Sequence, residues 1–248
     1  MPVRRPTSPV EWGSAAIEVR ARYTVELGRL EEHALGGLEL VAESLERVME
    51  AVQHQDIELA ALVIADDDRV DGRYLEVHQG ILSMLAREAP VATDLRLITA
   101  LLAVVNHLER MGDQCVNIAK LIPLAGHRPP AHAEMLEKIA DMGRRAGAVL
   151  DQARVAFARR DLAMAEDLVI KDEAVNALNR ECFHLALEIS NDEDTREWAM
   201  HMMLVARWLE RLADNAVDIG EQCAFVITGL FREFTDASEV KLISGESI

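Results

Sequence analysis

Aromatic residues make up only 4% of the 248-residue sequence, although half of all its residues are hydrophobic. The hydrophobic share is ample for a buried core in a chain of this length. Sheets are usually rich in aromatic and β-branched side chains, whereas the Ala, Leu and Glu that are plentiful here favour helices. This composition predicts an all-α fold.

Cysteine is scarcer still, with only Cys115, Cys182 and Cys223. The three are odd in number, lie far apart and form no CxxC pair. This pattern argues against a disulfide framework and against a zinc site built from thiolates. We therefore expect three reduced thiols packed in the core.

The sequence also lacks an excess of positive charge and long apolar runs. The formal net charge is −17, which would repel a phosphate backbone, so direct binding of nucleic acid is not expected. The longest uncharged stretch, LITALLAVVNHL at 97–108, is too short to span a bilayer, and the N-terminus has no apolar signal core. We expect a cytoplasmic protein that reaches a membrane only through its partners.

Apolar residues recur three and four positions apart in long stretches, as in 27–52, 97–122 and 198–226. Breaks near residues 55, 91, 127, 160 and 192 divide the chain into six long helices. The proline-rich loop PLAGHRPPA breaks helices most strongly, so we expect two three-helix bundles. The expected domains are 10–123 and 131–231, with flexible tails at 1–9 and 235–248.

The two halves also resemble each other. LERMGDQCVNIAK at 108–120 aligns with LERLADNAVDIGE at 209–221, and VIADDDRVD at 63–71 resembles VIKDEAVN at 169–176. The second alignment pairs Asp67 with Asp172 and Asp71 with Asn176. Duplication of one three-helix unit explains both alignments.

Acidic and amide side chains form a ladder on the third helix of each half. They stand four residues apart, and so project from one helix face; they are Glu109, Asp113 and Asn117 in the first half, and Glu210, Asp214 and Asp218 in the second. Like charges at this spacing repel by a few tenths of a kcal/mol. Antiparallel packing would bring the preceding helix level with each ladder, adding Asp67 and Asp71 in the first half and Asp172 and Asn176 in the second.

Such oxygen-rich clusters suit hard or borderline cations, namely iron, manganese, magnesium or zinc. The alternative is that the carboxylates form a solvated helix face, as most charge runs on bundle helices do. The residues alone leave both interpretations open.

At these motifs, and at APVATDLR before the third helix, the sequence resembles the PhoU family of phosphate-transport accessory proteins. The resemblance implies a negative regulator of the phosphate-starvation response that links the ATPase subunit of the phosphate transporter to a sensor histidine kinase. It also implies iron or zinc on Glu109, Asp113, Glu210 and Asp214, with manganese or magnesium as alternatives. Further ligands would be Asp67, Asp71, Asp172, Asn117 and Asp218, and we expect a homodimer.

A di-iron oxidase or metal-storage bundle is the rival interpretation, because ECFH at 181–184 places Glu and His three apart on a helix. A di-iron site needs two such pairs, and the first half offers His78 without the matching Glu. The sequence also lacks a phosphate-cradling loop, a nucleophile elbow and HExxH. We therefore expect a protein that binds partners and is not an enzyme.

Overall fold

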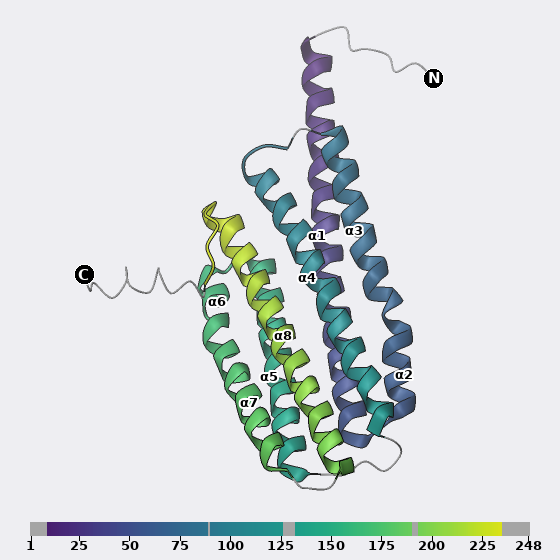
Figure 1. Ribbon diagram of the computed structural model, residues 1–248. Helices are drawn as coiled ribbons and strands as arrows, with labels where there is room; N and C mark the ends of the chain where they lie inside the picture. The colour runs from purple at the N-terminus through teal and green to yellow at the C-terminus, as the bar shows by residue number, and fades with distance from the viewer. Residues whose placement is uncertain (1–8, 89, 126–131, 190–192, 235–248) are drawn as a thin grey trace, which may run out of the picture.

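The structure is a computed structural model that describes residues 9–88, 90–125, 132–189 and 193–234, with side chains from residue 20 onward. Within these ranges every regular element is helical, which confirms the all-α prediction (Figure 1). None of the described helices is long and apolar enough to cross a bilayer. The elements are α1 (Pro9–His54), α2 (Ile57–Asp66), α3 (Asp68–Arg87), α4 (Thr93–Leu121), the 3-10 turn η1 (Ile122–Ala125), α5 (Ala133–Arg159), α6 (Leu162–Glu166), α7 (Leu168–Glu188) and α8 (Glu193–Thr228).

The helices are interrupted where the sequence predicts, and two of these interruptions have the same backbone geometry and the same type of N-cap. Gln55 and Arg160 adopt left-handed backbone conformations, with φ of 51° and 54°, and so end the preceding helices. The next residue caps the following helix: the Asp56 carboxylate accepts from the Leu59 N–H at 2.9 Å, as Asp161 does from Met164 at 3.0 Å. The same turn therefore opens the second helical segment of each half.

Two interruptions inside these segments were not predicted, and they turn six long helices into eight in the described residues. They fall at Asp67, between α2 and α3, and at Asp167, between α6 and α7. The Asp67 carbonyl accepts from the N–H groups of both Val70 and Asp71, so the helix tightens there without a proline or glycine. The first interruption thus lies within the acidic ladder region.

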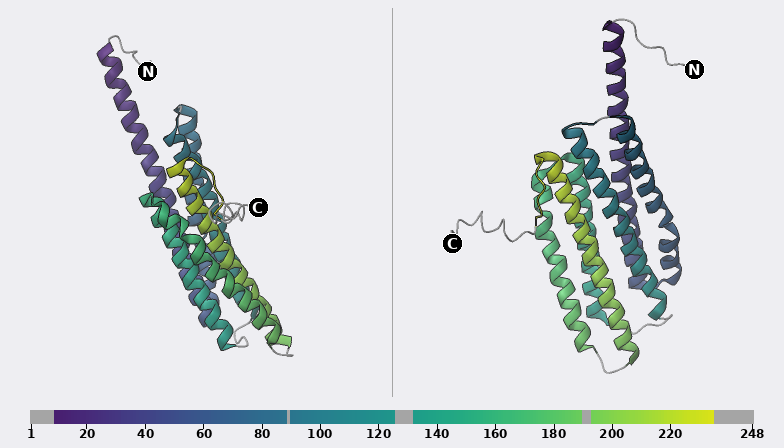
Figure 2. Two further views of the ribbon diagram at one scale, coloured as in Figure 1. Left: turned by 90° about the vertical axis from the view of Figure 1, so that its left-hand side faces the viewer. Right: turned by 45° about the horizontal axis from the view of Figure 1, so that its top comes forward.

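The helices form two three-helix bundles that pack against each other. The first contains α1, α2 with α3, and α4, and the second contains α5, α6 with α7, and α8; α4 packs on α8 and α1 on α5. Figures 1 and 2 show α2 and α3 along one edge of the molecule, and α6 and α7 along the opposite edge. One continuous hydrophobic core joins both halves, including Leu108 and Met111 of α4 and Leu209 and Leu212 of α8.

The proposed domain bounds, 10–123 and 131–231, remain a prediction, because this shared core does not itself mark a boundary. The expected tails lie outside the described residues, except that Pro9 already begins α1. All three cysteines are buried and unpaired, as expected. Burial raises the pKa of Cys115 to about 12 and that of Cys182 and Cys223 to about 11, so these thiols stay protonated near neutral pH.

Candidate metal centres

The first acidic cluster lies between α3 and α4 and consists of Asp71, Glu109 and Asp113, with Asp67 at the α2–α3 junction. Burial, together with the charges of Asp71 and Asp113, raises the pKa of Asp67 to about 6. Burial, followed by the charges of Asp113 and Asp71, also raises the pKa of Glu109. The four carboxyl groups therefore share one electrostatic environment, as the hairpin packing predicted.

Gly112 lies where α4 passes closest to Asp67 and Val70. A Cβ atom at this position would lie 2.9 Å from Val70 Cγ1 and 3.1 Å from Asp67 Oδ1. The absence of a side chain lets α3 approach α4 directly beside the carboxylates. The second half has Ala213 at the aligned position, and this residue is fully buried.

The second cluster lies between α7 and α8 and includes Asp172, Asn176, Glu210 and Asp214. Asp172 is only 7% exposed, and its Oδ2 atom accepts a hydrogen bond from Asn176 Nδ2 at 2.7 Å. Burial, and then the Asp214 charge, raises the pKa of Asp172 to about 6. Burial and the Glu210 charge likewise raise the pKa of Asp214.

Two oxygen atoms of this second cluster are buried without a hydrogen-bond partner, namely Oδ1 of Asp172 and Oδ1 of Asn176. Orphaned acceptors of this kind are costly, at about 1–3 kcal/mol each. Only a donor or a cation would satisfy them. The donor set consists of carboxylate and amide oxygens, which suits the hard and borderline cations expected from the sequence.

The burial pattern supports the sequence alignment of the two halves. Val70 and Val77 on α3 are fully buried, as are their aligned partners Val175 and Cys182 on α7. In this register Asp67 corresponds to Asp172, and these are the two carboxyls whose pKa is raised to about 6. The duplicated unit therefore places a carboxyl group with a raised pKa at the same point in both halves.

The remaining predicted ligands, Asp218 and Asn117, lie at the edges of the two acidic clusters. Asp218 faces α4, where its Oδ2 atom is 3.4 Å from His107 Nδ1, and the same nitrogen is 2.9 Å from Asn215 Oδ1. Asp218 thus takes part in the contact between the two halves. Asn117 is half-buried one turn beyond Asp113. A ligand role for either residue stays a prediction.

Sequence reasoning missed the arginine beside the second cluster. Arg207 pairs with the Glu210 carboxylate through Nη1, and its charge, together with that of Arg211, offsets part of the rise in the pKa of Asp214. The i, i+3 spacing of Arg207 and Glu210 was the available signal. In the first cluster, Lys120 has the corresponding effect on Asp67.

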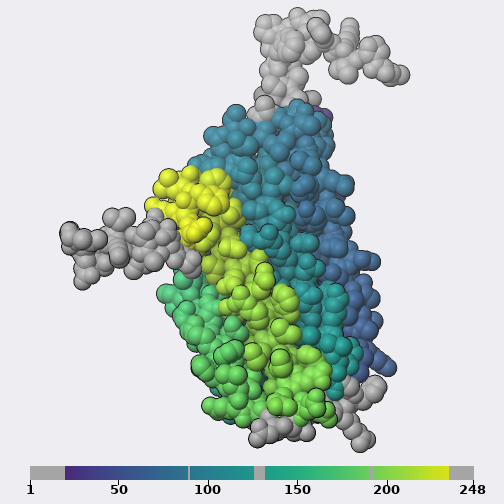
Figure 3. Space-filling view, in the orientation of Figure 1, coloured from purple at the N-terminus to yellow at the C-terminus, as the bar shows by residue number. Residues whose placement is uncertain are grey.

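As the side chains stand, no group of three or more His, Cys, Asp or Glu residues in the described part of the chain is arranged to hold a metal ion. Mutual repulsion and the ion pair of Arg207 favour this spread arrangement. Metal binding would require changes in side-chain rotamers that draw the carboxylates together. The helices that carry the two clusters lie next to each other on one face of the molecule: Figure 3 shows α4 and α8 side by side, between α3 and α7.

The residues of the rival di-iron interpretation do not join either cluster. Glu181 Oε2 accepts from Lys138 Nζ on α5 at 2.8 Å, whereas His184 is exposed on α7. The side chains of Glu181 and His184 therefore lie in different environments and do not form a shared site. Nothing in this geometry favours an oxygen-activating di-iron centre.

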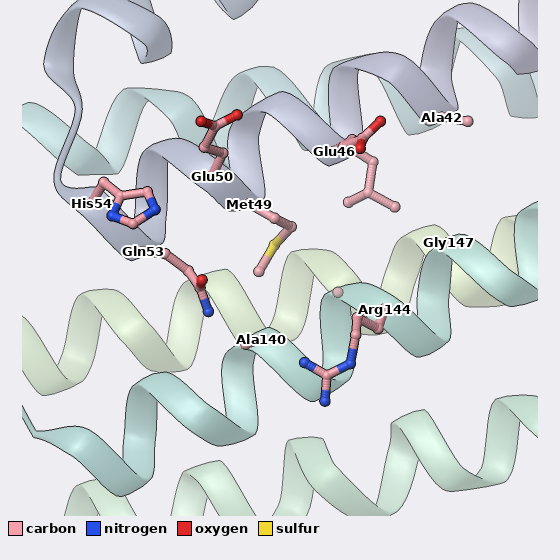
Figure 4. A pocket seen from close by; sticks show the side chains of 11 residues that line it. Ala42, Glu46, Met49, Glu50, Gln53, His54, Ala140, Arg144 and Gly147 are labelled. Atoms are coloured by element: carbon pink, nitrogen blue, oxygen red, sulfur yellow. The ribbon is translucent and has the colours of Figure 1, made fainter.

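A separate hollow of about 500 Å³ lies between α1 and α5 (Figure 4). It opens because α5 presents small residues there, and Met49 of α1 points into it and rests on Gly143. Glu46 and Glu50 line it from α1 and Arg144 from α5. Its charges are mixed in sign, so among the described residues the two acidic clusters remain the stronger candidates for a cation.

Comparison with known proteins matches the family model "PhoU domain" twice, at residues 38–122 and 139–223. The two matches contain the two acidic ladders. They are also spaced as the internal repeat requires.

Relatives and solved structures match over most of the chain. A Mycobacterium leprae protein named phosphate-specific transport system accessory protein PhoU homolog 1 is 30% identical over 87% of this chain and 96% of its own length. A similarly named Clostridium acetobutylicum protein is 30% identical over 76% of this chain and 86% of its own. The crystal structure of the phosphate transport system regulatory protein PhoU from Streptococcus pneumoniae aligns with a TM-score of 0.78 at 25% identity, covering 85% of this chain and 99% of that one. PhoU from Pseudomonas aeruginosa aligns at 0.76 and 26% identity, over 84% of this chain and 100% of that one.

Proposed function

The chain belongs to the PhoU family, and on that basis we propose that it restrains phosphate uptake and the phosphate-starvation response while phosphate is plentiful. The observation that supports this role is the match of both halves to the family model, together with relatives named as accessory proteins of phosphate transport. The protein acts by binding, linking the ATPase subunit of the phosphate transporter to a sensor histidine kinase. It works in the cytoplasm as a homodimer and makes no contact with nucleic acid.

The two acidic clusters hold metal ions in this proposal, with iron or zinc as the first expectation and manganese or magnesium as alternatives. The ligands of the first site are Asp67, Asp71, Glu109 and Asp113, and those of the second are Asp172, Asn176, Glu210 and Asp214. The support is the orphaned oxygen atoms of the second cluster and the raised pKa values in both. A bound cation would offset the repulsion and would fasten α3 to α4 and α7 to α8.

A reporter of the phosphate-starvation response in a deletion strain tests the regulatory role. We expect expression to stay high in phosphate-rich medium when the gene is deleted, and to fall again when the wild-type gene is returned. Expression that stays off in the deletion strain would contradict the proposal. Phosphate uptake measured in the same strains tests the transport branch, and we expect it to be higher without the gene.

A further inference from the structure

An apolar groove of about 560 Å³ lies between the C-terminal half of α7 and the N-terminal half of α8. Phe183, Met200 and Leu204 line it and are 47%, 64% and 46% exposed. Leu187, one turn beyond Phe183, is 69% exposed. Large apolar side chains gathered at one hollow are typical of a surface that binds another protein.

Two arginines lie at the edge of this groove. Arg180 and Arg207 line it, and their side chains are 60% and 55% exposed. Each arginine already has one carboxylate neighbour of its own chain, but both stay accessible to solvent. The two guanidinium groups complement an occupant that carries carboxylates beside its apolar residues.

The side chains that line this groove have no counterparts in the first half of the chain. In the first half, the positions aligned with Phe183, Met200, Leu204 and Arg207 are occupied by smaller or polar residues: His78, Thr99, Ala103 and Asn106. Both halves fold with the same core, so the apolar side chains are not required by the three-helix unit. Their exposure carries a solubility cost that a docking role would explain.

We propose that this groove docks an amphipathic helix of the phosphate transporter's ATPase subunit, with large apolar side chains on one face and carboxylates at its margin. This inference rests on the proposed function, because it names the surface through which that function is exerted. The transporter is the chosen partner because the relatives are named for the phosphate transport system. Phe183 and Met200 supply adaptable apolar contacts, and the arginines fix the orientation of the helix.

The test measures the dissociation constant of the purified ATPase subunit for the full chain and its variants. The first variant combines Met200→Glu with Leu204→Glu, which places two charges in the groove. Its control is Leu82→Glu, the same change at a leucine of α3 that is 51% exposed. We expect at least tenfold weaker binding for the groove variant and less than twofold change for the control.

A second pair of variants tests the charge and leaves the apolar residues intact. We expect Arg180→Glu to weaken binding several-fold, whereas Arg145→Glu on α5, an arginine 48% exposed, leaves it unchanged. All altered side chains lie at the surface, and circular dichroism confirms that each variant folds.

Each outcome separates this inference from the proposed function. If the wild type binds and the groove variants bind equally well, the groove assignment is wrong and the regulatory role stands. If the wild type does not bind the ATPase subunit, the transporter link of the proposed function fails together with the docking site. If the groove variants lower the mass seen in sedimentation equilibrium, or deletion of 235–248 strengthens binding, a second copy or the chain's own end covers the groove, which also overturns the proposal.

Discussion

Replacing Asp172 with Asn should stabilise the metal-free protein at about pH 8, although it removes a proposed metal ligand. The side chain is 7% exposed, and burial with the Asp214 charge raises its pKa from 3.8 to about 6. A shift of roughly two units corresponds to about 3 kcal/mol. Because Asp214 and Asn176 share in this environment, we expect a gain of about 1–3 kcal/mol in the free energy of unfolding.

The sign of the pH dependence follows from the raised pKa. The folded state holds the Asp172 proton more tightly than the unfolded state, so the wild type loses stability as the pH rises from about 4 through about 6. The variant lacks this loss, so the gap between the two proteins should narrow as the pH is lowered through the same window.

Urea unfolding followed by circular dichroism, with a chelator present, measures this gap. Asp167→Asn is the matched control, since hydrogen bonding to Gln152 lowers the pKa of Asp167 and the same change there should destabilise the protein. Added metal should reverse the order, stabilising the wild type more than Asp172→Asn. If the metal-free Asp172→Asn variant is less stable than the wild type at about pH 8, the buried Asp172 carboxylate does not destabilise the folded protein.

Three further predictions concern single side chains. Gly112→Ala would place a methyl group against Asp67 Oδ1 and Val70, so we expect a loss of about 1–3 kcal/mol in urea unfolding and weaker metal binding at the first cluster only. Arg207→Gln frees the Glu210 carboxylate, and we expect calorimetry to show tighter metal binding at the second cluster; unchanged affinity would contradict the assigned role of this ion pair. Gly229 has φ of +75° and its Cβ would collide with the Arg96 guanidinium, so Gly229→Ala should lower the thermal midpoint, at a cost of about 1–2 kcal/mol.

Much of the fold could be predicted because its determinants are local. The apolar seams set the helices, and short polar turns such as the one at Gln55 and Asp56 set their ends. The interruptions at Asp67 and Asp167 could not be predicted in this way. No proline or glycine marks them, and they depend on a carbonyl that accepts two N–H groups.

The candidate site was predictable to the extent that it depends on helix spacing and hairpin symmetry. Spacing by four placed Glu109 and Asp113 on one face, and the duplication pointed to the same arrangement near Asp172. The contact of His107 with Asn215 and Asp218 depends on how α4 packs on α8, for which the sequence carries no short-range signal. The α7–α8 groove was missed for the same reason.

Metal analysis of the purified protein shows whether the two acidic clusters hold cations. The wild type is compared with a variant in which the four ladder carboxylates are changed to Ala: Glu109, Asp113, Glu210 and Asp214. Helical content is checked in both. We expect bound iron, zinc or a similar cation in the wild type and almost none in a folded variant. Equal metal content in the two proteins would contradict this expectation, and the ladders would then be solvated helix faces.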